Sequence, residues 1–227
     1  MRNVFILYMP ESNYEAMTHY QDTIINKVQP ERIFRYVDYN LRNQLTNIFG
    51  NRPIAVWGSR DSAANRSRFE NMSGGDDILI VEGGIIKLLG KIACKTISPD
   101  LSKELWKNLR GDEIEGWNLI YFIANPLEIE IPFDEFRKLF NYSPNWTLRG
   151  LTSVSNDKLE DFYSRYDDLY SILIKLKNRE EISEIKEQPV DTKQDEIEQT
   201  LESVDEKEGF GARQNMEANR NFAKQMK

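Results

Sequence analysis

The residues best suited to chemistry in this sequence are tryptophans placed beside polar loops. Trp57 ends an apolar run and is followed closely by Ser59 and by a polar, basic segment over residues 60–72. Trp106 and Trp117 accompany a second polar segment. A planar ligand such as a flipped nucleobase needs aromatic faces to stack on and polar groups that read its edge. These residues could supply both if they converge; if they do not, they are ordinary core residues, as strand tryptophans commonly are.

Basic side chains are grouped near the same tryptophans. The two groups are Arg60, Arg66 and Arg68, and Lys103, Lys107 and Arg110. A charged run is usually a solvated surface, but Lys and Arg contacts with phosphates also position a protein on a nucleic acid before any base is read. The sequence therefore predicts that these six residues bind a nucleic-acid backbone around the base site.

Familiar catalytic arrangements are missing from the sequence. His19 is the one histidine and Cys94 the one cysteine, so neither a zinc site built from this pair nor an internal disulfide is expected. No Gly-rich phosphate loop ending in Lys-Ser or Lys-Thr is present. We therefore expect a chain that is itself non-catalytic, with no cofactor and no metal ion. A nuclease with an unrecognised active site is the competing hypothesis.

The negative charge of the chain is concentrated near its C-terminus. The formal net charge is −7, yet residues 179–208 hold 4 basic and 12 acidic side chains, and residues 209–227 hold 4 basic and 1 acidic. The rest is nearly neutral and can carry a local basic face. We predict a folded domain over residues 1–176, a disordered acidic linker over 177–208, and the start of an incomplete C-terminal element over 209–227.

The sequence shows no sign of membrane insertion or export. No apolar stretch approaches the roughly 20 residues that a membrane span requires. The N-terminal apolar run over residues 4–8 is too short and too soon polar for a signal peptide. Together with the single cysteine, these features predict a cytoplasmic protein with no membrane partner.

Apolar runs bounded by Gly and Pro predict an α+β domain. Strands are expected over residues 5–8, 23–28, 53–57, 77–81, 85–89, 90–96 and 117–123. Helices are expected over residues 32–49, 101–109, 133–140 and 156–174, with residues 60–72 forming a loop or short helix. Elements in this order describe a curved sheet or small β-barrel surrounded by helices.

The order of these motifs resembles a known superfamily over about residues 1–155. A strand ending in Val-Trp-x-Ser at residues 56–59 precedes a Gly-Asp turn at 75–76 and Gly-Lys-Ile-Ala at 90–93. A Gly-Trp-x-x-Ile-Tyr-Phe strand at 116–122 and a short helix led by a proline complete the pattern. The pattern is similar to that of the PUA-like superfamily, specifically its EVE and YTH branches.

The resemblance implies which residues would bind a base. In the YTH branch, a tryptophan at the position of Trp57 and a second one in a later loop form a cage around a methylated base. The second wall would then be Trp106, with Trp117 as its rival. The full set of implied base-binding residues is Trp57, Ser59, Trp106, Trp117, Asn13 and Tyr20, the last two standing in for an N-terminal loop that has no clear counterpart here.

The resemblance also implies a ligand and a biological role. Modified DNA is the expected ligand, ahead of RNA. Such domains resemble the N-terminal readers of modification-dependent (type IV) restriction enzymes, which a nuclease or motor domain follows. We therefore predict the targeting module of a restriction or antiviral defence system, with a nuclease or motor domain or subunit as its partner. The alternative is a protein-interaction module that binds no nucleic acid.

Overall fold

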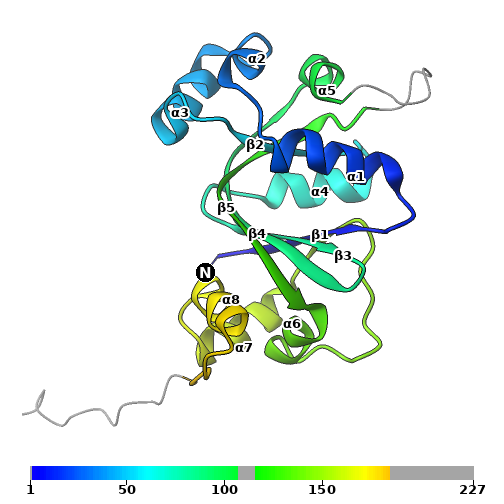
Figure 1. Cartoon of the computed structure of the whole chain (residues 1–227), viewed down its shortest axis with the longest axis vertical. Helices are drawn as coiled ribbons and strands as arrows, with labels where there is room; N and C mark the ends of the chain where they lie inside the picture. The colour runs from blue at the N-terminus through cyan, green and yellow to red at the C-terminus, as the bar shows by residue number, and fades with distance from the viewer. Residues whose placement is uncertain (1, 107–115, 185–227) are drawn as a thin grey trace, which may run out of the picture. The chain divides into compact units, whose positions relative to one another are not determined.

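The computed structural model describes residues 2–106 and 116–184 (Figure 1). These residues belong to one compact unit, Met1–Ile185. Two predicted backbone-binding residues, Lys107 and Arg110, lie outside the described ranges. The C-terminal element predicted over 209–227 and most of the predicted linker lie outside them as well.

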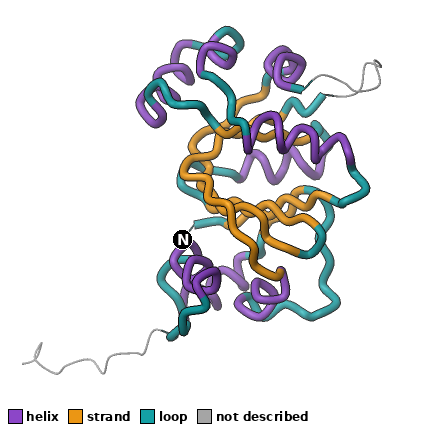
Figure 2. Tube along the Cα trace, in the orientation of Figure 1, coloured by secondary structure: helices purple, strands orange, loops and turns teal. Residues whose placement is uncertain are grey.

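A six-stranded mixed sheet forms the centre of this unit, drawn in orange in Figure 2. The strands are β1 (Val4–Met9), β2 (Ala55–Ser59), β3 (Asp77–Glu82), β4 (Ile85–Ile97), β5 (Leu119–Pro132) and β6 (Leu151–Ser153), in the order β2-β5-β4-β3-β1-β6. β1 and β3 run parallel, whereas the other paired strands are antiparallel. The predicted α+β class is confirmed.

β4 and β5 are long strands that curve the sheet. Their antiparallel register shifts at three places, one of which spans Gly90, and such bulges bend and twist a sheet. A Cβ atom at Gly90 would lie 2.4 Å from Cγ2 of Ile123, so glycine permits this close crossing. The prediction of two separate strands over 85–89 and 90–96 is wrong, because Gly90 bends one continuous strand instead of making a turn.

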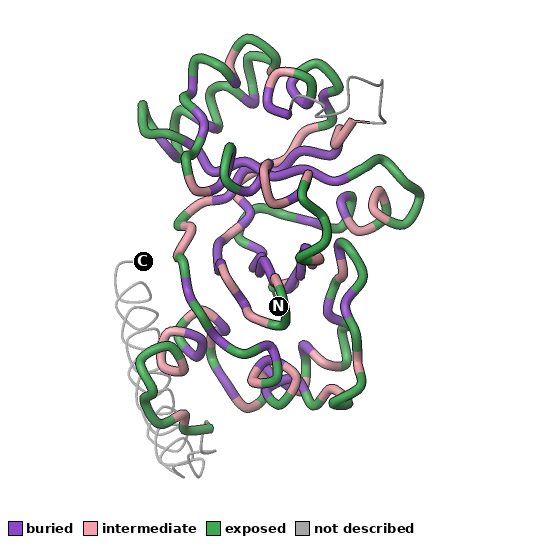
Figure 3. The backbone as a smooth tube through the Cα atoms, turned by 45° about the vertical axis from the view of Figure 1, so that its right-hand side comes forward, coloured by how far each residue is buried: buried purple, intermediate pink, exposed green. Residues whose placement is uncertain are grey.

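Helices cover both faces of the sheet (Figure 1). They are α1 (Tyr14–Tyr20), the π-helix η1 (Gln21–Ile25), α2 (Pro30–Phe34), α3 (Tyr39–Phe49), α4 (Ala63–Asn71), α5 (Pro99–Leu105), α6 (Phe133–Leu139), α7 (Asn156–Arg165) and α8 (Leu169–Asn178). In β1, Val4 and Ile6 pack in a cluster with α6, α7 and α8, while Phe5 and Leu7 pack with α1 and α4. Successive side chains of a strand point to opposite faces, so β1 and β3 are buried along nearly their whole length (Figure 3).

The predicted strand over residues 23–28 is wrong. Gln21–Ile25 is a π-helical turn that continues α1, and Val28 makes a single bridge, to Ile54. Tyr20 and Ile24 are both buried and lie four residues apart, so helical spacing places them on one face. The apolar residues that suggested a strand therefore reach the core from a helix.

Two predicted long helices are each divided in two. The segment 32–49 holds the end of α2 and then α3, because the Asp38 carboxylate accepts a hydrogen bond from the backbone N–H three residues later (2.8 Å). The segment 156–174 is divided between α7 and α8, and Asp168 caps α8 in the same way (3.0 Å). Aspartate is a favoured N-cap residue, so each mid-segment aspartate starts a new helix.

Asp76 fastens the start of β1 to the turn before β3. Its buried carboxylate accepts hydrogen bonds from the Asn3 backbone N–H (3.0 Å), the Asn3 side-chain amide (3.2 Å) and the Ser73 backbone N–H (2.8 Å). Hydrogen bonds to an ionised acceptor are stronger than those between neutral groups. This joint holds β1 in parallel register with β3.

We expect Asp76→Ala to lower the free energy of unfolding by about 2–4 kcal/mol, because two backbone N–H groups lose their acceptor. Urea unfolding followed by circular dichroism measures this change. The matched control is Asp134→Ala on α6, whose carboxylate is 69% exposed, and its effect should stay below about 0.5 kcal/mol. Equal effects of the two substitutions would contradict the role of Asp76.

Candidate functional site

A cavity of about 260 Å³ lies where the ends of β1 and β2 meet the start of α1. Its walls include Asn13, Trp57, Ser59 and Trp117, four of the six predicted base-binding residues. Arg60, a predicted backbone-binding residue, also lines it. Segments far apart in the sequence therefore converge on one cavity that has an aromatic, a polar and a cationic component.

The two tryptophans of the cavity contact each other. The Trp57 and Trp117 ring centroids are 5.2 Å apart and the ring planes are inclined by 59°. A base sandwiched between parallel rings would need about 3.5 Å on each side, or about 7 Å between the rings. Trp57 is 1% exposed and forms part of the core, whereas Trp117 is half-buried. In this arrangement Trp57 is the buried wall of the cavity, and Trp117 is the half-buried one.

Two asparagines present complementary polar groups to the cavity. The Asn13 side-chain oxygen accepts a hydrogen bond from the Ala16 N–H (3.1 Å), which leaves its NH₂ group to donate. The Asn65 NH₂ group donates to the Arg60 carbonyl (3.0 Å), which leaves its side-chain oxygen to accept. Asn65 was not predicted. The polar segment over 60–72 carried the signal, but only its folding as α4 brings this residue to the cavity.

Ser59 is buried at the end of β2 and pairs with β5. Its hydroxyl lies 3.4 Å from the Tyr121 hydroxyl, and either oxygen can donate. Burial raises the pKa of Tyr121, which keeps this phenol protonated. The Ser59 hydroxyl is thus oriented by Tyr121 at the edge of the cavity.

Trp106 and Tyr20 do not line the cavity. Trp106 follows α5 in an extended conformation, is 7% exposed, and donates its indole N–H to Oγ1 of Thr23 (3.3 Å). Its ring lies against Gly58, where a Cβ atom would be 2.7 Å from Cη2 of the indole. Tyr20 is buried and meets the Trp57 ring at 6.2 Å. Both aromatics support the cavity wall from within the core.

The predicted backbone-binding residues that the structure describes are Arg60, Arg66, Arg68 and Lys103. Arg60 is 53% exposed at the cavity and lies 3.8 Å from the Glu15 carboxylate. Arg66 forms an ion pair with Asp61, which offsets its charge. Arg68 donates to a carbonyl of its own helix (3.0 Å), and Lys103 is exposed on α5. Arg60 is the one of these four that borders the cavity.

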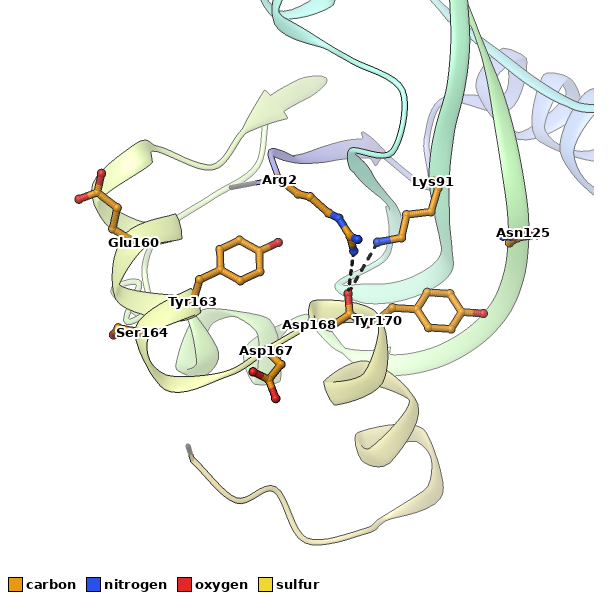
Figure 4. A pocket seen from close by; sticks show the side chains of 9 residues that line it. All are labelled: Arg2, Lys91, Asn125, Glu160, Tyr163, Ser164, Asp167, Asp168 and Tyr170. Atoms are coloured by element: carbon orange, nitrogen blue, oxygen red, sulfur yellow. Dashed lines mark hydrogen bonds and ion pairs between the residues drawn. The ribbon is translucent and has the colours of Figure 1, made fainter. Parts of the chain in front are cut away.

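A larger cavity, of about 1140 Å³, lies near the start of β1 and the turn between α7 and α8 (Figure 4). Arg2 and Lys91 both point to the Asp168 carboxylate, at 3.3 Å and 3.8 Å. Lys91 also lies 2.5 Å from the fully buried Asp77, and burial raises the pKa of Asp77. In this larger cavity, the cations are neutralised by carboxylates, and none of the predicted base-binding residues is among the residues that line it. We therefore place the candidate site at the smaller cavity.

Metal and thiol chemistry find no support in the described residues. Across residues 2–106 and 116–184, no group of three or more His, Cys, Asp and Glu side chains could hold a metal ion. Burial raises the pKa of the Cys94 thiol to about 12, so its thiolate is scarce at neutral pH. None of the helices in these ranges is long and apolar enough to cross a membrane.

Comparison with solved structures relates the fold to known domains. The N-terminal domain of Thermococcus gammatolerans McrB bound to m5C DNA superposes with a TM-score of 0.57 and 15% identity, covering 76% of this chain and 99% of that domain. The Pho92 YTH domain in complex with m6A gives a TM-score of 0.42 and 9% identity, covering 80% and 90%. No family model and no curated protein matches the sequence. The chain thus has the fold of the McrB N-terminal domain, and the predicted resemblance to a base-reader domain is confirmed for the fold.

His19 is buried beside the tryptophans of the site. It is 3% exposed, and its ring centroid lies 4.7 Å from that of Trp117 and 5.8 Å from that of Trp106. Neither ring nitrogen has a hydrogen-bond partner within the part of the chain that the structure describes. Burial lowers the pKa of His19, and the nearby carboxylates of Glu15 and Asp22 partly oppose this. The ring is therefore neutral when the protein is folded at neutral pH.

Acidification below the ordinary histidine pKa of 6.5 is expected to destabilise the fold, because the unfolded chain takes up a proton that the buried His19 resists. The free energy of unfolding should fall more in the wild type than in His19→Phe between about pH 7.5 and about pH 5.5. Urea unfolding across this range measures the difference. His19 is the one histidine of the chain, so parallel pH profiles of the two proteins would contradict its burial in the neutral form.

Proposed function

We propose that this chain is a nucleic-acid-binding module that takes a flipped, methylated base of DNA into the cavity beside Trp57 and Trp117. The observation that carries the proposal is the convergence of Asn13, Trp57, Ser59 and Trp117 on one cavity with Arg60 at its edge. The structurally similar McrB domain was solved bound to m5C DNA. A flipped base must be both stacked and read, and this cavity contains groups for each task.

The polar groups of the cavity can bind an acceptor and a donor on the edge of a base. The Asn13 NH₂ group can donate to a ring nitrogen, and the Asn65 oxygen can accept from an exocyclic amine. Adenine and cytosine place a ring-nitrogen acceptor beside an exocyclic amine on the Watson–Crick edge, and thymine and guanine place a carbonyl acceptor beside a ring N–H, so these two groups can read an edge of each base. Leu7, Met9 and Leu151 line the same cavity and offer an apolar surface to a methyl group.

The backbone of the nucleic acid would be held by cations around the cavity. Arg60 is the first candidate, because it borders the cavity and its ion pair with Glu15 is long (3.8 Å). Lys103 is an exposed candidate farther along the surface, and Arg68 is a half-buried one. Contacts of this kind weaken steeply as salt rises, which separates this function from that of a protein-interaction module.

The proposed role is that of a targeting module in a modification-dependent restriction or defence system. Its base-reading domain would span residues 1–176, its acidic linker 177–208 and a further element would start at 209, although residues 177 and 178 still belong to α8. A nuclease or motor domain or subunit would be its partner, and the cytoplasm its location. The likeness of fold to an McrB N-terminal domain supports this role.

We expect Trp117→Ala to reduce the preference for methylated over plain oligonucleotide about tenfold, because one stacked aromatic contributes about 1–3 kcal/mol. Fluorescence anisotropy with oligonucleotides carrying 5-methylcytosine, N6-methyladenine or no modification measures the preference. Trp117 is half-buried, so its substitution tests the wall with less damage to the core than that of Trp57, which is 1% exposed.

The matched control is Trp146→Ala. Trp146 is also half-buried, stacks on Tyr142 at 3.8 Å, and belongs to the cluster formed with α6, α7 and α8. The Trp146→Ala substitution should leave the preference for methylated over plain oligonucleotide unchanged. An unchanged preference in Trp117→Ala would overturn the proposed wall, and a wild type that binds all three oligonucleotides equally would overturn the proposed function.

A further inference from the structure

The exposed side of α3 carries a stripe of asparagines. The buried residues of this helix recur at every fourth position and are Leu41, Leu45 and Phe49. Each residue turns an α-helix by about 100°, so the side opposite the buried one is formed by Asn40, Asn43 and Asn47. All three are exposed, and α3 lies at the upper edge of the domain in Figure 1. Three amide groups on one side of a helix therefore face solvent.

This stripe does not help α3 to form. Asparagine is a weaker helix former than alanine, lysine or glutamate, because its side chain competes for backbone hydrogen bonds in non-helical conformations. Within residues 2–106 and 116–184, none of the three amides has a hydrogen-bond partner. Departures from local propensity are expected at functional sites. The stripe thus offers free donors and acceptors to a ligand at the expense of helix stability.

The charges around the stripe suit a polyanion. Residues 39–60 contain three arginines and no aspartate or glutamate. The carboxylate of Asp38, just before them, is engaged as the N-cap of α3 (2.8 Å). Beyond the other end of α3, a cavity of about 590 Å³ is lined by Lys27 and Arg52 and, among the described residues, by no acidic side chain. This surface therefore attracts a negatively charged partner and offers it amide groups.

We infer that α3 contacts the major groove of double-stranded DNA through this asparagine stripe. The major groove of B-DNA admits an α-helix, and an asparagine amide can bind both N6 and N7 of an adenine there. The major groove of an RNA duplex is too deep and narrow for side chains to read, so the ligand is duplex DNA. This contact is separate from the cavity beside Trp57 and Trp117, and it goes beyond the proposed function by adding a preference for adenine in the duplex.

The experiment compares the full chain with the double variant Asn43→Ala/Asn47→Ala. Alanine is the better helix former, so circular dichroism should show that α3 is intact. We expect the variant to bind a DNA duplex with adenine-rich flanks about tenfold more weakly, because it loses contacts with two bases. The loss should be the same whether the central base is 5-methylcytosine, N6-methyladenine or unmodified. The preference for modified over plain DNA should remain, because the cavity is unchanged.

The matched control is the double variant Asn156→Ala/Asn178→Ala. It also removes two exposed amides from helices, but from α7 and α8, which pack in a different cluster from α3. It should bind every duplex as the wild type does.

A second probe tests the groove directly. Replacing the unmodified adenines of the flanks by 7-deazaadenine removes the N7 acceptor from the major groove and leaves Watson–Crick pairing intact. We expect this replacement to weaken binding of the wild type and to leave binding of Asn43→Ala/Asn47→Ala nearly unchanged, because the variant has already lost the contact.

The possible failures are distinguishable. Wild-type affinity in Asn43→Ala/Asn47→Ala, an equal loss in the control variant, or a wild type that is insensitive to 7-deazaadenine would each overturn the inference. A wild type that shows the losses expected for α3 but has no preference for a modified base would overturn the proposed function and leave this inference standing.

Discussion

The candidate site depends on how closely two tryptophans approach Gly58 in β2. A Cβ atom at Gly58 would lie 2.7 Å from Cη2 of Trp106 and 2.7 Å from the carbonyl oxygen of Trp117. Both distances are shorter than a carbon atom tolerates, so glycine is required for this packing. The contact holds the backbone of Trp117 over β2, the strand that carries Trp57. The indole rings of Trp57 and Trp117 therefore lie side by side.

The alternation of side chains along β2 decides which tryptophan can share a cavity with Trp57. Val56 packs in one cluster and Trp57 in another, because successive strand residues face opposite sides. Trp106 packs in the cluster of Val56, on the side away from Trp57. Trp117 is packed against both clusters and can therefore reach the Trp57 side, where the cavity lies.

Charge and burial divide the polar groups of the domain into two kinds. Near the start of β1, Asp77, Lys91, Asp168 and Arg2 lie within ion-pair distance of one another, so these opposite charges offset one another. At the other end of β1, the Asn13 side-chain oxygen caps α1, and within residues 2–106 and 116–184 its NH₂ group makes no hydrogen bond, so it can donate to a ligand. The second end of the strand is thus the one equipped for recognition.

The sequence by itself determined the α+β class, most strands, and a short set of aromatic and polar candidates. Apolar runs between Gly and Pro sufficed for the strands that became β1, β2 and β3, because their burial on both faces leaves an apolar run in the sequence. The helix over 133–140 was likewise recognisable and corresponds to α6. Local patterns failed where capping aspartates and Gly90 changed the course of the chain.

Only the tertiary structure decided which candidates meet. Trp106 and Trp117 both lie beside polar segments in the sequence, but their positions in the fold differ. Trp106 packs on the Gly58 side of β2, whereas Trp117 reaches the side that carries the Trp57 ring. Asn65 could be placed at the cavity only once α4 was known. The physical reason is that a side chain's face and neighbours are set by strand pairing and helix packing between distant segments, and local spacing carries no record of either.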